Sequence, residues 1–199
     1  MANIKIFGSP QSRAYRALWM AKELGIPYDH VPMGPADTKK GDYASVNPNA
    51  KIPALQDGEV VLFESMAINL YLAQKFDKGL WPKNLADIGR AYQWSFWVMT
   101  ETEKPVLTLL LDAVGYVKQT PEVLAECRKA LDKPFGIIDK ALAGKQYLLG
   151  DSFSVADLNA ASVLGWVRPA KLDLSPWPNL KAWLERCTGR PAAVAAHKA

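Results

Sequence analysis

The N-terminal part of the chain alternates between strand-like and helix-like patterns of hydrophobic positions. Ile4 and Ile6 flank a lysine, a period-two pattern typical of a short strand. Apolar side chains then recur with the i, i+3, i+4, i+7 spacing of a helix, at Ala14, Ala17, Leu18 and Ala21. Gly25 and Pro27 are helix stop signals, and residues 28–31 are suited to a second strand. Together these segments predict a β-α-β unit.

An irregular segment separates this unit from a predicted hairpin. Residues 33–50 are rich in Gly, Pro, Asp, Asn and Lys, a composition that favours a loop. Two apolar runs within residues 52–63 are separated by Asp57-Gly58, the strongest short-range signal of a β-hairpin. A helical pattern over residues 65–76 follows. The resulting order, β-α-β-β-β-α, is that of a thioredoxin-like α/β layer.

The pattern changes after residue 78. A polar link containing Gly and Pro occupies residues 79–86, and residues 87–199 carry helix-period apolar patterns with no convincing strand. We therefore predict an α/β domain at residues 1–78, a linker at 79–86 and an all-α helical bundle at 87–199. A chain of 199 residues is long enough for two such domains.

The charge is spread over the whole chain. Lys and Arg number 24 and Asp and Glu number 20, a net charge of +4, and both predicted domains carry a mixture of signs. This distribution argues against nucleic acid as a partner, since a phosphate-binding face needs clustered cations. The two cysteines, Cys127 and Cys187, lack metal-ligand spacing and are expected to be reduced thiols. No long apolar run predicts a membrane span, so we expect a cytoplasmic protein without a membrane partner. The two histidines, His30 and His197, also form no metal-binding pattern, so we expect no metal.

Two short segments carry candidate chemistry in the first part of the chain. Ser12 directly precedes the first predicted helix, where its hydroxyl either caps the helix or stabilises an anion at the positive helix end. Ile52-Pro53 lies at the mouth of a predicted strand. If this peptide bond is cis, the Ile52 backbone groups are available to an extended peptide-like ligand; otherwise the segment is a plain turn.

A third segment contains Glu64 and Ser65, at the end of a predicted strand and the start of a helix. Ser65 alone is an ordinary N-cap. Glu64 adds an acceptor for an ammonium group, and the helix N-terminus offers donors to a carboxylate. An α-amino acid presents both groups together.

The three segments together resemble the cytosolic glutathione transferase family, in particular its serine-type, phi-like members from plants and bacteria. The motifs are F-G-x-P-x-S at 7–12, N-P-x-x-K-I-P-A-L at 47–55 and E-S-x-A-I-x-x-Y-L at 64–72. In the second domain, Ser154 and Asp157 resemble the family's capping box, and residues 183–191 resemble its closing helix.

The resemblance implies a cytosolic detoxifying enzyme that adds glutathione, its co-substrate, to hydrophobic electrophiles, with peroxide reduction as a side activity and a homodimeric assembly. Ser12 would donate a hydrogen bond to the glutathione thiolate. Ile52 would pair through its backbone with the cysteinyl unit, held by a cis-Pro53. Glu64 and Ser65 would hold the γ-glutamyl end.

The resemblance also places Lys39 and Lys51 near the glycine carboxylate. It leaves alternatives for the residue that activates the thiol, because Ser9, Gln11 or Arg13 is close enough in sequence to replace Ser12 in that role. A non-catalytic binding or docking module with the same fold is the alternative function.

Overall fold

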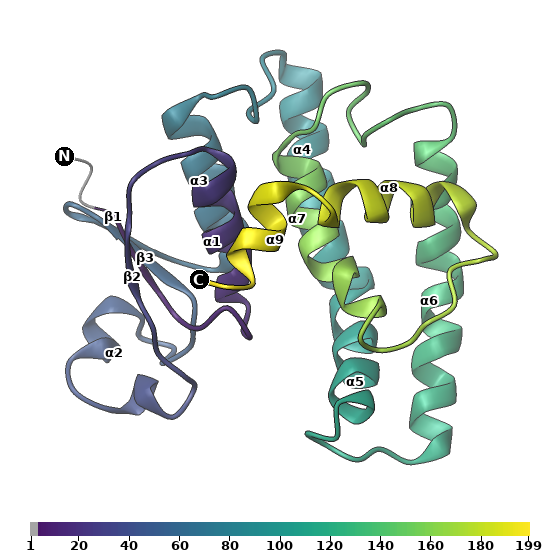
Figure 1. Ribbon diagram of the computed structural model, residues 1–199, viewed down its shortest axis with the longest axis horizontal. Helices are drawn as coiled ribbons and strands as arrows, with labels where there is room; N and C mark the ends of the chain where they lie inside the picture. The colour runs from purple at the N-terminus through teal and green to yellow at the C-terminus, as the bar shows by residue number, and fades with distance from the viewer. Residues whose placement is uncertain (1–3) are drawn as a thin grey trace. The chain divides into compact units, whose positions relative to one another are not determined.

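The computed structural model describes residues 4–199, and its contacts divide the chain into two units (Figure 1). The first takes in the chain up to Trp81 together with Gly189–Ala199, and the second is Pro82–Thr188. The boundaries drawn from the sequence, at residues 78 and 87, stay a prediction. The structure adds that the C-terminal segment groups with the α/β unit.

The first unit is built on a four-stranded mixed sheet with the strand order β2-β1-β3-β4. Strand β1 pairs parallel to β2 and antiparallel to β3, which pairs antiparallel to β4. The alternation at Ile4 and Ile6 is confirmed, since both side chains are fully buried. The strand bounds are Ile4–Phe7, Asp29–Val31, Ala54–Asp57 and Val60–Phe63 for β1 to β4.

The predicted hairpin is present, but its loop lies one residue later than expected. Asp57 pairs with Val60 in the β3–β4 register, so the two loop residues are Gly58 and Glu59. Gly58 has a φ of +61°, a conformation that glycine adopts without steric cost. Asp57 stays in the strand, where its carboxylate accepts a hydrogen bond from the Tyr71 hydroxyl at 2.8 Å.

Two helices of the first unit, α1 (Ala14–Glu23) and α3 (Ser65–Phe76), pack against each other and against the sheet (Figure 1). The segment predicted to be irregular contains two further short elements, η1 (Asp37–Lys39) and α2 (Tyr43–Val46). Tyr43 is buried, and its ring lies 5.9 Å from that of Phe7. A local sequence pattern does not predict such contacts between segments that are distant in the chain.

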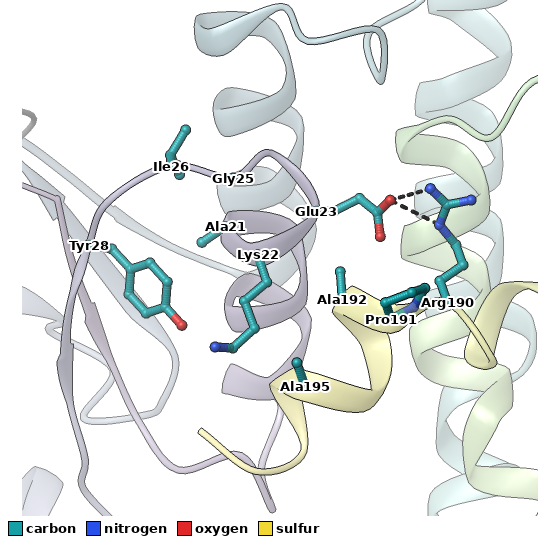
Figure 2. Close-up of a pocket in the computed structure, with 10 residues that line it drawn as sticks. All are labelled: Ala21, Lys22, Glu23, Gly25, Ile26, Tyr28, Arg190, Pro191, Ala192 and Ala195. Carbon is teal, nitrogen blue, oxygen red and sulfur yellow. Dashed lines mark hydrogen bonds and ion pairs between the residues drawn. The ribbon is translucent and has the colours of Figure 1, made fainter.

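The C-terminal end forms two helices where the sequence predicted one closing helix over residues 183–191. Helix α8 (Pro178–Thr188) ends before Arg190, whose backbone is extended because a residue before proline disfavours the helical conformation. Helix α9 (Pro191–Ala196) then packs against α1. The Arg190 guanidinium binds the Glu23 carboxylate at the end of α1, with its Nε 2.9 Å from Oε1 (Figure 2).

The second unit is helical, as predicted. Every residue of α7 is buried, so this helix forms the centre of the unit, and α4 and α8 pack against it. None of the helices within residues 4–199 has the length and apolar character needed to cross a membrane. The elements of the unit besides α8 are α4 (Leu85–Glu101), α5 (Glu103–Ala113), α6 (Pro121–Leu142), α7 (Val155–Leu164) and η2 (Gly165–Val167).

Candidate active site

A glycine brings the turn after β1 close to the start of β3. Gly8 has a φ of +128°, and a Cβ placed on it would lie 2.6 Å from the Ala14 Cβ and 3.1 Å from the Ile52 Cβ. Any other residue would therefore collide with Ala14 and crowd Ile52. The glycine allows the turn that carries Ser12 to approach Ile52, so the structure brings two of the sequence-predicted segments together.

Ser12 lies half-buried in this turn, just before α1. Its hydroxyl oxygen accepts the backbone N–H of Ala14, the first residue of the helix, at 3.0 Å, as the sequence led us to expect, but Arg13 and not Ser12 occupies the N-cap position. The hydroxyl donates its proton to the Ser9 carbonyl at 2.7 Å. Because a hydroxyl rotates about its C–O bond, this proton can be redirected to an anion at the helix start.

The Ile52–Pro53 peptide bond is cis, as the resemblance implied. The preceding carbonyl, that of Lys51, accepts two hydrogen bonds, from the Tyr43 hydroxyl at 2.8 Å and from the Asn47 amide at 2.7 Å. Burial raises the pKa of Tyr43 to about 12, so its hydroxyl remains a donor at neutral pH. These two anchors fix the backbone just ahead of Ile52.

Ile52 itself precedes the strand ladder. The pairing of β3 with β1 begins at Ala54, opposite Phe7, and Ile52 is half-buried while Pro53 is buried. The position therefore suits a residue that offers its main chain to an extended ligand, in the manner of an added strand.

The start of α3 has an unusual geometry. Glu64 is exposed and has a φ of +71° and a ψ of 112°, a region that residues other than glycine rarely occupy. Ser65 is only 3% exposed, and its Oγ accepts a hydrogen bond from Arg16 Nη1 at 3.1 Å. The expectation that Ser65 is the N-cap is wrong, because Glu64 occupies that position and the Ser65 hydroxyl faces α1 instead.

The two lysines are exposed. Lys39 is the last residue of η1, and Lys51 directly precedes Ile52. Lys51 is therefore adjacent to the segment that approaches the Ser12 turn. The assignment of Lys39 still rests on the sequence pattern alone.

The comparisons with known proteins agree with this geometry over most of the chain. The family models for the N-terminal and C-terminal domains of glutathione S-transferases match residues 2–74 and residues 91–191. The chain belongs to the glutathione S-transferase family. The fold expectation, a thioredoxin-like α/β domain followed by a helical domain, is thereby confirmed.

Relatives of this glutathione S-transferase family member come from plants and bacteria. The chain is 32% identical to "Glutathione S-transferase PARB" of Nicotiana tabacum, over 96% of this chain and 95% of the relative. It is 30% identical to "Glutathione S-transferase GstB" of Escherichia coli K12, over 89% of this chain and 88% of that one. A theta-class glutathione S-transferase from Xanthomonas axonopodis pv. citri, solved with glutathione bound, superposes with a TM-score of 0.85 at 30% identity, covering 100% and 99% of the two chains.

Three residues around the site of this family member were missed in the sequence, namely Arg16, Tyr43 and Asn47. Arg16 is fully buried although it carries a permanent charge. The signal that points to it is that it is the one charged residue in the otherwise uncharged run from Ala14 to Ala21. Asn47 is 2% exposed, and its Oδ1 also accepts the Asn49 backbone N–H at 3.0 Å, which shapes the turn before the cis bond.

A separate hollow in the first unit has a volume of about 710 Å³. It lies between the end of α1, the segment leading to Tyr28, and α9 (Figure 2). Its lining within the described chain includes Lys22 and the paired Glu23 and Arg190, but none of the residues that the sequence predicted for glutathione. We therefore treat it as distinct from the candidate active site.

Proposed function

We propose that this protein is a cytoplasmic glutathione transferase that stabilises the glutathione thiolate with Ser12 and adds it to hydrophobic electrophiles. The observation that supports this proposal best is the half-buried Ser12 hydroxyl at the start of α1, on a turn that approaches Ile52. The names of the relatives and the glutathione-bound neighbour support glutathione as the co-substrate.

The remaining candidate residues take one part of glutathione each. The cysteinyl unit pairs with the Ile52 main chain ahead of the β3 ladder, next to the buried Pro53. The γ-glutamyl ammonium binds the exposed Glu64 carboxylate, and the neighbouring α-carboxylate accepts a hydrogen bond from Ser65. The glycine carboxylate lies near the exposed Lys51, with Lys39 as a second cation.

The energy available at Ser12 is sufficient to activate the thiol. A free thiol has a pKa of about 8.5, and lowering it by two units requires roughly 2.7 kcal/mol in favour of the thiolate. One hydrogen bond to a charged group supplies about 1.5–3 kcal/mol, and a helix N-terminus adds about 0.3–1 kcal/mol. The thiolate has only to replace the Ser9 carbonyl as the acceptor of the Ser12 proton.

We propose a homodimer as the assembly. Each unit exposes large apolar side chains that a second copy could cover: Val60, Val61 and Phe63 on the edge strand β4, and Leu85 and Phe96 on α4. Light scattering coupled to size-exclusion chromatography should give twice the chain mass. A replacement of Phe63 by lysine should shift the protein towards the monomer.

The test of the catalytic proposal is a titration of bound glutathione by its thiolate absorbance. We expect a thiol pKa about two units below the free value in the wild type and a rise of about one unit or more in Ser12→Ala. Ser45→Ala is the matched control, because the Ser45 hydroxyl is exposed and donates to the nearby Asp42 carbonyl, so the thiol pKa should not change.

The outcomes separate the possible functions. An unshifted thiol pKa in the wild type would contradict the transferase proposal and favour a binding or docking module. A low pKa that persists in Ser12→Ala would leave the activity in place and transfer the role to Ser9, Gln11 or Arg13. Aryl halides, epoxides and hydroperoxides should then be assayed to define the electrophile and any peroxide reduction.

A further inference from the structure

The buried side chain of Arg16 lies directly behind one of the proposed glutathione-binding residues. Arg16 belongs to α1, is 0% exposed, and directs Nη1 to the Oγ of Ser65 at 3.1 Å. The two residues lie 49 positions apart in the chain, and their contact joins α1 to the first residue of α3. A buried permanent charge needs a specific arrangement of partners, so this contact is a defined feature of the unit.

The chemistry of the pair determines the role of the Ser65 hydroxyl. A guanidinium has only N–H donors, so Ser65 Oγ must be the acceptor in this hydrogen bond. A serine hydroxyl has a single proton, and that proton is then left to be donated to a different acceptor. The adjacent positive charge also polarises the O–H bond and attracts an anion. Ser65 thus keeps its proton available for a ligand beside a positive charge, and an ionised carboxylate, which only accepts, is the complementary ligand group.

We propose that Arg16 is a positioning residue that fixes Ser65 as a donor and thereby makes the site selective for the α-carboxylate of the γ-glutamyl group. The inference rests on the proposed function, since it takes glutathione as the ligand. Arg16 acts through Ser65 and does not touch the ligand. At this helix start, Glu64 binds the ammonium group, and its neighbour Ser65, which is hydrogen-bonded by Arg16, binds the carboxylate.

The experiment compares two ligands by calorimetry: glutathione, and an analogue whose γ-glutamyl α-carboxylate is a carboxamide. We expect the wild type to bind glutathione about 30-fold more tightly than the amide, in the range of a charge-assisted hydrogen bond. In Arg16→Gln, which keeps a hydrogen-bonding side chain but removes the charge, this preference should fall to about threefold or less. Arg16→Lys, a charged donor, should restore part of it.

Two further variants isolate the route of the effect. Ser65→Ala retains the arginine, yet it should lose the carboxylate preference to the same extent, because Arg16 is proposed to act through the hydroxyl. Lys22→Gln is the matched control, since it removes a cation from the same helix at a position that lies over the Tyr28 ring and lines the separate hollow. Its preference should equal that of the wild type. Circular dichroism identifies any variant that fails to fold.

The readouts distinguish this inference from the proposed catalysis. In Arg16→Gln the KM for glutathione should rise while kcat at saturation and the pKa of the bound thiol stay unchanged, because Ser12 governs the thiolate. An unchanged carboxylate preference in a folded Arg16→Gln would overturn the inference. A preference that survives in Ser65→Ala but not in Arg16→Gln would also overturn it, since Arg16 would then contact the ligand itself. A wild type that binds glutathione without lowering its thiol pKa would contradict the catalytic proposal and leave the selectivity test intact.

Discussion

Two helix starts in this protein use the same kinds of residue, a serine and a carboxylate, in opposite ways. At the start of α7, Asp157 is 0% exposed and its carboxylate accepts four hydrogen bonds. Two come from the N–H and the hydroxyl of Ser154, and the others come from the Leu148 N–H and the Trp183 indole. The capping box expected from the sequence is therefore confirmed, and it also ties α7 to α8.

At the start of α3 the carboxylate points outward. Glu64 is exposed and held at a positive φ, and within the described part of the chain its side chain makes no capping hydrogen bond to the helix. The serine beside it is bound by Arg16 from another helix. The side chains of Glu64 and Ser65 at this helix start therefore do not cap the helix.

The difference shows how one local motif serves stability in one place and binding in another. Where all donors and the carboxylate satisfy one another, the group is structural, because nothing remains for a ligand. At α3 the carboxylate is exposed on a strained backbone and the serine hydroxyl still has a proton to donate, so both groups remain able to bind a ligand. Replacement of the carboxylates should separate these two roles.

The largest effect is expected at α7. Asp157→Ala leaves four donors without their acceptor, three of them from backbone and indole N–H groups, and should lower the free energy of unfolding by about 3–5 kcal/mol. Urea denaturation followed by circular dichroism measures this loss. Asp173→Ala is the matched control, since Asp173 also accepts hydrogen bonds from a nearby serine but is exposed, and its removal should cost less than about 1 kcal/mol. Equal losses in the two variants would contradict the structural role of Asp157.

The sequence predicted those parts of the fold that depend on local signals. The alternation at Ile4 and Ile6, the hairpin around Gly58 and the capping box at Ser154 each lie within a few residues of chain, and each is present in the structure. In these segments the local conformational preference of the chain agrees with the tertiary fold, so a local sequence pattern predicts the structure correctly. The hairpin loop was misplaced by one residue because Asp57 is held in the strand by Tyr71, a residue of α3.

The features that were missed depend on contacts between distant segments. Arg16 is bonded to a residue 49 positions away, and Arg190 to one 167 positions away. The second contact, with the Tyr15 hydroxyl bound to the Ala193 carbonyl at 3.4 Å, explains why the C-terminal helix returns to the α/β unit. In the candidate site, the motifs correctly predicted the cis bond and proposed Ser12 and Glu64, but the buried side chains behind these segments have partners that no local pattern contains.

A smaller effect is expected on binding at α3. Glu64→Gln keeps the size of the side chain and removes its charge, so it should weaken glutathione binding about tenfold, because a hydrogen bond to a charged group is replaced by a neutral one at an exposed site. The free energy of unfolding should change by less than about 0.5 kcal/mol, as for other surface substitutions. Calorimetry and urea denaturation give the two numbers on the same sample. Glu59→Gln, an exposed glutamate of the hairpin loop, is the control and should leave both unchanged. A stability loss at Glu64 without a change in affinity would make this helix start structural, like that of α7.

The smallest effect is a gain in stability at the same position. Glycine adopts positive φ values at little cost, so Glu64→Gly should relieve the backbone while removing the carboxylate. Glycine also gives the unfolded chain more conformational entropy, which offsets part of the relieved strain, so the free energy of unfolding should rise by a net amount of about 0.5–1 kcal/mol. The glutathione affinity should still fall about tenfold, because the carboxylate is lost. Lys171→Gly is the matched control, because Lys171 has a φ of +55° and lies in the second unit, so it should gain similar stability and keep its affinity. If Glu64→Gly is less stable than the wild type, the glutamate supports the helix start, and the contrast with Asp157 disappears.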